Sequence, residues 1–141
     1  MTLLMDRDAL NAFIAREFPQ IADSFRVEEV APARLRARLI VTEAHLRPGG
    51  TVGGPSIFAL ADVAVYCMVL ARIGPVALAV TTNGSIDFMR KPAAGRDLIA
   101  ECTLLKLGRV LAVGDVLMRS EGSDEIAARC TMTYSIPPAR A

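Results

Sequence analysis

The feature that most constrains this chain is an almost unbroken apolar stretch from Ile57 to Ala71, which contains one ionisable carboxylate, Asp62. Gly53-Gly54-Pro55 precedes the stretch and Gly74-Pro75 follows it, a pattern typical of a helix that begins at a proline and ends at a glycine. A helix that is apolar on all sides has to be buried. Because the run is shorter than the ~20 residues that span a bilayer, the sequence predicts a core helix and no membrane segment.

Asp62 stands out within this helix, because an uncompensated buried carboxylate costs several kcal/mol. Either a neighbouring hydroxyl or backbone N–H holds it as a structural group, or it has a chemical role, in which burial would make it a stronger base. The residues alone leave both readings open. The helix N-terminus offers the N–H groups of Gly53, Gly54 and Ser56, which could polarise a carbonyl. Asp62 lies ~12 Å further along the helix, so a dimer would be needed to bring both groups to one substrate.

Composition narrows the class of protein. The chain of 141 residues predicts a single domain, residues 1–141. A net charge of +1 and 5% aromatic residues argue against a nucleic-acid partner, and 52% hydrophobic residues favour at least a dimer. His45 is the only histidine, which excludes zinc sites built on several histidines and leaves a Ser-His-Asp triad only His45 to use. No metal or other cofactor is expected.

The cysteines and the N-terminus bear on localisation. Cys67, Cys102 and Cys130 show no metal-binding spacing and are predicted to be buried free thiols. The first residues, MTLLMDRDAL, lack an apolar core of signal-peptide length. We therefore expect a cytoplasmic, reduced protein.

Periodicity predicts the remaining elements. Residues 6–18 place their apolar side chains on one helical stripe, which predicts an amphipathic helix that covers the sheet edge. Alternation predicts strands at 25–30, 34–41, 77–89, 97–107, 110–120 and 125–136, the fourth and fifth forming a hairpin across Gly108-Arg109. The arginines of residues 34–41 are expected to form a solvated face. One apolar helix among antiparallel strands needs a curved sheet around it, which predicts an α+β fold.

The motifs resemble those of the hotdog-fold acyl-CoA thioesterases, in particular the phenylacetic-acid-degradation (PaaI) type. That family reads approximately N-P-x-G-x-x-H-G-G, then L-x-D, then a strand ending in x-I-x-F-x-x-P. This chain has Arg47-Pro48-Gly49-Gly50-Thr51-Val52-Gly53-Gly54-Pro55, then Leu60-Ala61-Asp62, then Ser85-Ile86-Asp87-Phe88, with the spacing preserved. The resemblance implies a hotdog fold: a curved antiparallel sheet wrapped around one long central helix, with an extra N-terminal helix.

The resemblance also implies an activity, hydrolysis of an acyl-CoA thioester to free acid and CoA. By this match Asp62 is the catalytic carboxylate, as general base or nucleophile, and the N–H of Gly54 polarises the thioester carbonyl. Thr81 falls near a position where the family places a hydroxyl close to the attacking water. The site is shared across a dimer interface in such enzymes, so a homodimer or a dimer of dimers is expected.

Three departures from the family pattern concern the site. Gly53 replaces the usual histidine, Arg47 the usual asparagine, and Pro55 a glycine. Arg47 could pair with Asp62 and weaken it as a base, and Asn83 is a candidate to position water instead. Arg90 and Lys91 are candidates to bind CoA phosphates.

Three rival readings follow. One is a non-catalytic hotdog protein that binds acyl-CoA or another apolar ligand. The second is hydration or dehydration of acyl thioesters, disfavoured because His45 lies in a loop far from Asp62 in sequence. The third is a structural oligomer, which leaves Asp62 unexplained. The sequence leaves open the acyl group and whether its carrier is CoA or an acyl carrier protein.

Overall fold

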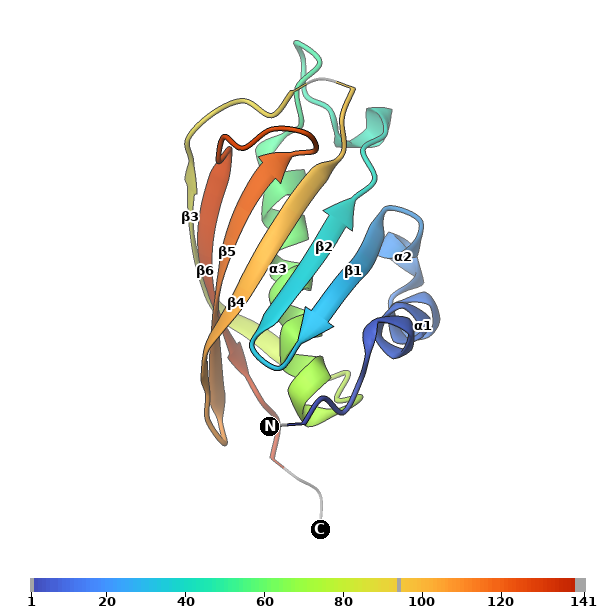
Figure 1. Ribbon diagram of the computed structural model, residues 1–141, viewed down its shortest axis with the longest axis vertical. Coiled ribbons are helices and arrows are strands. Elements are labelled where there is room, and N and C mark those ends of the chain that lie inside the picture. Colours follow the sequence, from blue (N-terminus) through green and yellow to red (C-terminus); the bar gives the residue numbers. More distant parts are fainter. Residues whose placement is uncertain (1, 94, 139–141) are drawn as a thin grey trace.

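The computed structural model describes residues 2–93 and 95–138, and in it a curved sheet wraps one long helix (Figure 1). The helices are α1 (Arg7–Glu17), α2 (Pro19–Ala22), the one-turn η1 (Glu43–His45) and α3 (Gly54–Ile73). The strands are β1 (Phe25–Ala31), β2 (Arg34–Leu39), β3 (Val80–Phe88), β4 (Leu98–Leu107), β5 (Leu111–Ser120) and β6 (Ala128–Ser135). This arrangement confirms the α+β hotdog fold and the expected order of helix, two strands, long helix and four strands; α2 and η1 are additions.

The central helix α3 is buried as its composition requires. All residues from Val63 to Ala71 are buried, and α3 packs against each of the six strands. Its C-cap, Gly74, has a φ of 93°, a left-handed conformation that glycine adopts without strain. On length and hydropathy the 20 residues of α3 could also span a membrane, but 67% of their most apolar window is buried inside the domain.

The order of strands in the sheet is β1-β2-β4-β5-β6-β3, with every described pair of neighbours antiparallel. β3 follows α3 in sequence but lies at the far edge, paired with β6. Its position there is set by long-range pairing, which local alternation does not encode. The two edges of the sheet are therefore β1 and β3.

The β1 edge is covered by α1. Asn11 in α1 donates from Nδ2 to the carbonyl of Val27 and accepts the Val27 N–H at Oδ1, both at 2.9 Å. The side-chain amide thus takes the place of another strand, which blunts an edge that would otherwise invite pairing. This confirms that the N-terminal helix covers the sheet edge. β3, in contrast, pairs on one side only, and its residues from Thr82 to Ser85 are exposed.

The arginine face of β2 is more than a solvated surface, contrary to expectation. Arg38 lies within 2.8 Å of Glu28, 3.0 Å of Asp97 and 2.6 Å of Glu121, and its side chain is only 18% exposed. These carboxylates raise the pKa of Arg38 further above its usual range. Asp97 also accepts the N–H of Val41, so this cluster joins β1, β2, the start of β4 and the turn after β5.

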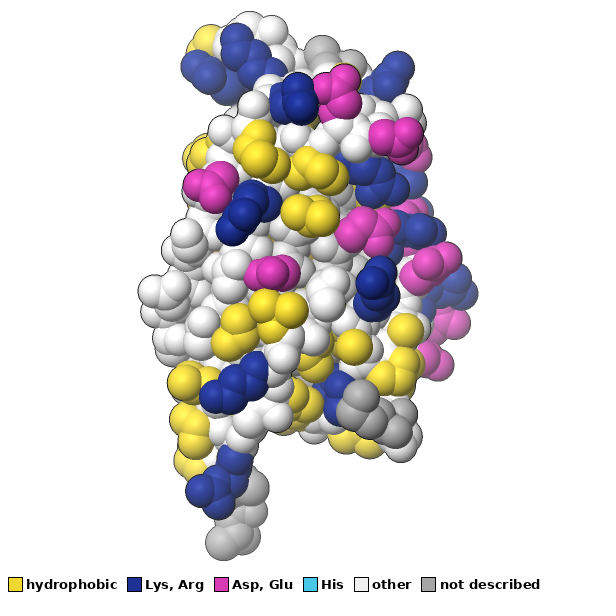
Figure 2. Space-filling view, turned by 60° about the vertical axis from the view of Figure 1, so that its left-hand side comes forward, with side chains coloured by type: hydrophobic (Ala, Val, Ile, Leu, Met, Phe, Trp, Pro, Cys, Tyr) yellow, Lys and Arg dark blue, Asp and Glu magenta, His cyan; other side chains and the backbone are white. Residues whose placement is uncertain are grey.

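The convex side of the sheet carries both apolar and charged groups. Figure 2 shows separate hydrophobic groups among Lys, Arg, Asp and Glu side chains on this side. Leu105 and Leu117, exposed to 57% and 48%, belong to its strands. Beneath the sheet, Cys67, Cys102 and Cys130 are buried free thiols, as predicted.

Candidate active site

The start of α3 presents one free backbone donor. The N–H of Gly53 donates to the carbonyl of His45 at 2.9 Å, and the N–H groups of Ser56 and Ile57 donate to the carbonyl of Gly53. Pro55 has no N–H. Of the three donors expected at this helix start, only the Gly54 N–H has no acceptor among residues 2–93 and 95–138. It lies at the positive end of the α3 dipole, where a developing negative charge is stabilised.

Phe88, at the end of β3, lies directly over Gly54. A Cβ atom at position 54 would lie 3.4 Å from Phe88 Cζ, an ordinary contact distance, so the tip of the ring packs against the start of α3. Phe88 itself is 54% exposed. Gly54 and Phe88 line a cleft of about 430 Å³ at the end of the molecule where α3 begins.

The rim of this cleft is basic. Arg47, Arg90 and Lys91 all line it, so the structure brings together three of the residues considered for substrate binding. Arg90 pairs with Glu125 at 2.9 Å in a solvent-exposed contact. Within the described part of the chain, Arg47 and Lys91 form no ion pair. The suggested pair between Arg47 and Asp62 is therefore not formed within one subunit.

Asp62 is half-buried and held on one side by two hydroxyl groups. Thr81 donates to Oδ1 at 2.5 Å, and Tyr134 donates to the same oxygen at 2.7 Å. No described residue donates to Oδ2. Because no buried side-chain oxygen or nitrogen in the described residues lacks a partner, Oδ2 is not fully buried. The carboxylate therefore has one fixed oxygen and one free oxygen.

A bulge in β3 explains why Thr81 reaches Asp62. Thr81 lies opposite Tyr134, and Asn83 lies opposite Thr133, so the pairing with β6 shifts by one residue at Thr82. Regular alternation along residues 77–89 would put Thr81 and Asn83 on one face, but the bulge puts them on opposite faces. The extra residue turns Thr81 to the side of α3 and leaves Asn83 exposed on the same side as Thr133. Asn83 therefore does not lie beside the carboxylate of its own subunit.

Sequence reasoning missed Tyr134. Alternation within β6 puts Ala128, Cys130, Met132 and Tyr134 on the buried side, facing the helix. A buried tyrosine hydroxyl needs a hydrogen-bond partner, and Asp62 is the one carboxylate within the apolar part of α3. A buried tyrosine facing a helix with a single carboxylate was therefore the signal that could have identified Tyr134. Burial and the charge of Asp62 raise the pKa of Tyr134 above its usual range, so its hydroxyl remains a donor.

Gly54 and Asp62 lie on one rigid helix, eight residues apart in the sequence. At 1.5 Å per residue they are separated by ~12 Å, which is too far for one carbonyl carbon and its oxygen to contact both. Within a single subunit the free N–H of Gly54 and the free carboxylate oxygen of Asp62 therefore cannot act on the same carbonyl group.

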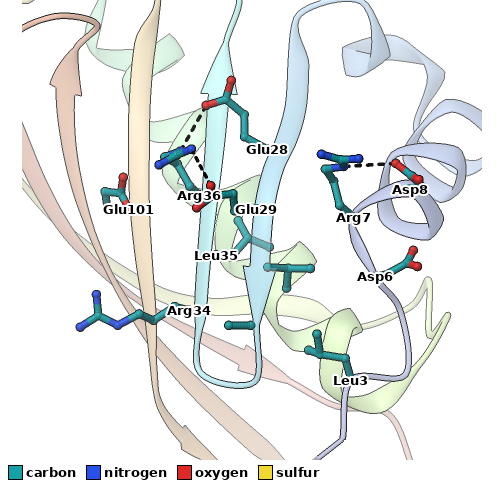
Figure 3. A pocket seen from close by; sticks show the side chains of 12 residues that line it. Leu3, Asp6, Arg7, Asp8, Glu28, Glu29, Arg34, Leu35, Arg36 and Glu101 are labelled. Atoms are coloured by element: carbon teal, nitrogen blue, oxygen red, sulfur yellow. Dashed lines mark hydrogen bonds and ion pairs between the residues drawn. The ribbon is translucent and has the colours of Figure 1, made fainter.

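A second cleft, between residues 3–8 and strands β1 and β2, is lined by charges that neutralise one another (Figure 3). Arg36 lies 3.3 Å from Glu28 and 3.1 Å from Glu29, and Arg7 lies 3.2 Å from Asp8. Neither Gly54 nor Asp62 lines this cleft. The candidate site is therefore the region around α3, not this ion-paired surface.

Comparison with known proteins identifies the family. The model of the thioesterase superfamily matches residues 49–127, which include Gly54, Asp62 and Phe88. A candidate esterase from Deinococcus radiodurans is 35% identical over 107 residues, covering 76% of this chain and 70% of that protein.

Solved structures similar to this chain lead to the same family. A candidate thioesterase from Silicibacter is 59% identical, with a TM-score of 0.92 over 98% of this chain and 96% of that one. A mutant of the phenylacetic acid degradation protein PaaI from Thermus thermophilus is 29% identical, with a TM-score of 0.73 over 84% of this chain and 99% of that one. These likenesses support thioester hydrolysis as the general chemistry of the site. The chain belongs to the thioesterase superfamily, in which it is similar to the phenylacetic-acid-degradation type.

Proposed function

We propose that the protein hydrolyses acyl-CoA thioesters at a site formed by Gly54 of one subunit and Asp62 of a second. The observation that carries this proposal is the position of the two free groups on α3. The Gly54 N–H suits a developing oxyanion, and Asp62 Oδ2 suits an attacking water. Because they are ~12 Å apart on one helix, a second copy has to supply one of them.

The exposed β3 edge supports the presence of a second copy. β3 pairs with β6 on one side and has no strand on the other among the described residues, whereas α1 covers the β1 edge. β3 also carries Thr81, next to Asp62, and Phe88, over Gly54. A two-fold contact at β3 would therefore bring both halves of the site to the same interface. We expect a homodimer or a dimer of dimers.

The basic rim supports CoA as the carrier. The phosphates of CoA need cationic partners, and Arg47, Arg90 and Lys91 border the cleft beside Gly54. The apolar residues Ile57 and Phe88 in the same cleft would border the thioester and the start of the acyl group. Three buried free thiols suit a reducing compartment, and we place the protein in the cytoplasm.

The reaction follows from these groups. The Gly54 N–H donates to the carbonyl oxygen, and water adds to the carbonyl carbon as its proton passes to Asp62 Oδ2. The C–S bond then breaks, and the proton moves from Oδ2 to the departing sulfur, which gives the free acid and the CoA thiol. Direct attack by Oδ2, followed by hydrolysis of the mixed anhydride by water, would use the same oxygen.

The test is thiol release from short, medium, long and aromatic acyl-CoAs, for the wild type and for Asp62→Asn. We expect the variant to lose at least a hundredfold in kcat while its melting temperature stays close to that of the wild type. The acyl-CoAs that the wild type cleaves fastest would also identify the class of acyl group. An inactive wild type that CoA esters nonetheless stabilise against heat would replace the proposal with the non-catalytic binding protein. The replacement of the family's histidine and asparagine by Gly53 and Arg47 would then be its explanation.

A further inference from the structure

The two oxygens of Asp62 are not equivalent. Thr81 and Tyr134 both donate to Oδ1, at 2.5 and 2.7 Å, and they are cross-strand neighbours on β3 and β6. A rotation of the carboxylate about χ2 would break both hydrogen bonds at once. The pair therefore holds the carboxyl plane in one orientation and leaves Oδ2, which is not fully buried, without a partner among the described residues.

Tyr134 is well fixed for this task. The residue is 4% exposed, and its ring lies 5.9 Å from the ring of Tyr66. Its hydroxyl is also within hydrogen-bond distance, 3.0 Å, of the main-chain carbonyl oxygen of Asp62, so the phenol contacts the helix where Asp62 is attached. A rigid aromatic donor with two torsion angles loses little conformational freedom when it holds a partner.

We propose that Tyr134 is a positioning residue for Asp62: together with Thr81 it occupies Oδ1, so that Oδ2 is the oxygen that takes the proton from water or attacks the thioester. This inference rests on the proposed function and extends it from the residue to the reacting atom. Preorganised hydrogen bonds of this kind stabilise the reacting geometry without rearrangement during the reaction.

The first test compares Tyr134→Phe with Tyr66→Phe. Each variant removes one buried tyrosine hydroxyl, but that of Tyr66 donates to the carbonyl of Ala77 at 3.0 Å, away from the carboxylate. We expect Tyr134→Phe to lower kcat about ten- to a hundredfold with KM within about twofold, as for a lost hydrogen bond to a charged group. Tyr66→Phe should keep the wild-type kcat.

Thr81, the second donor to Asp62 Oδ1, allows a comparison of variants with and without the hydroxyl group. Thr81→Val should lower kcat as Tyr134→Phe does, whereas Thr81→Ser keeps the hydroxyl and should restore most of it. Melting temperatures of all variants show whether a loss of activity reflects a loss of folded protein. A purely structural role for Tyr134 would lower the melting temperature and leave kcat per folded molecule unchanged.

A second measurement does not depend on activity. The chain has two tyrosines, so in Tyr66→Phe the absorbance change at alkaline pH reports Tyr134 alone. We expect Tyr134 to stay un-ionised well above pH ~10, where a free tyrosine ionises, and to ionise at lower pH once Asp62→Asn is added.

The outcomes are separable. An active wild type with an unaffected Tyr134→Phe would overturn the positioning role and leave the proposed function standing. A wild type that hydrolyses no thioester would overturn both the function and the catalytic role, although the titration would still report the hydrogen bond. A Tyr134 whose ionisation does not move when Asp62→Asn is added would show that the bond to Asp62 is absent, and the inference would fail.

Discussion

At the scale of single residues, the two halves of the candidate site have different requirements. Gly54 has to present its backbone N–H, next to the Phe88 ring, to the substrate carbonyl. Asp62 has to carry a charge within a mostly apolar helix, and the hydroxyls of Thr81 and Tyr134 stabilise that charge by hydrogen bonds. Removing the donor at Gly54 and removing the charge at Asp62 therefore test two separate contributions to the proposed reaction.

Gly54→Pro removes the donor and replaces it with a residue that can begin a helix. Proline is favoured at the first position of a helix, and Gly53, which would precede it, already has the extended conformation required there, with φ −74° and ψ 152°. We expect kcat to fall about a hundredfold to a thousandfold, the usual effect of losing one oxyanion donor. Circular dichroism should show unchanged helix content. Full activity in this variant would exclude the Gly54 N–H from the reaction.

Arg90 and Lys91 are predicted to contact the carrier rather than the acyl group. Reversing both charges, Arg90→Glu with Lys91→Glu, should raise KM for acyl-CoA about three- to tenfold, since exposed charge pairs contribute ~0.2–1 kcal/mol each. The same acyl group on N-acetylcysteamine, a thiol without phosphates, serves as control and should show an unchanged KM. An equal effect on both substrates would point to a folding defect instead of lost phosphate contacts.

At the scale of elements, α3 and β3 form the site between them. α3 supplies the donor at its start and the carboxylate further along, while β3 supplies the hydroxyl of Thr81 at one end and the ring of Phe88 at the other. The bulge at Thr82 lets one strand reach both the start of α3 and Asp62, because it changes the face on which Thr81 lies.

The exposed edge of β3 is open to a direct test. Ser85 is exposed near the middle of that strand, and a lysine there would bring like charges together if two β3 edges meet. We expect Ser85→Lys to weaken dimerisation at least tenfold and to make specific activity fall on dilution. Leu105→Lys adds the same charge to an exposed position on β4 and should change neither. Light scattering and activity at several concentrations decide between these outcomes.

The sequence was most informative where local chemistry decides the structure. The proline and glycine signals bracketed α3, the alternating residues marked every strand, and the motif around Asp62 indicated both the fold and the family. In each case the signal lies within a few residues of the feature that it predicts.

The sequence was least informative where distant segments meet. The position of β3 beside β6 depends on pairing over many residues, and the shift at Thr82 leaves an apparently regular alternation in the sequence. Asn83 was therefore considered for positioning water although it does not lie beside the carboxylate of its own subunit, and Tyr134, which reaches Asp62 from another strand, was overlooked. The role of Arg38, with partners in three separate segments, was hidden for the same reason.

At the scale of the whole molecule, the two sheet edges are treated differently. Asn11 closes one edge from within the chain, and the other is left open beside the candidate site. An open edge is an aggregation hazard unless something covers it, so a partner at β3 would serve stability and catalysis together. In the proposed mechanism the dimer, not the single chain, would be the smallest active unit.

The distance between Gly54 and Asp62 along α3 has a consequence for mixtures of defective subunits. Each site would take its donor from one chain and its carboxylate from the other, so Gly54→Pro and Asp62→Asn dimers would both be inactive. A mixed dimer would contain one site with both defects and one with neither. Unfolding and refolding the two variants together in equal amounts should thus restore about a quarter of the wild-type activity. If each chain held a complete site, mixing would restore nothing, because every site would keep its own defect.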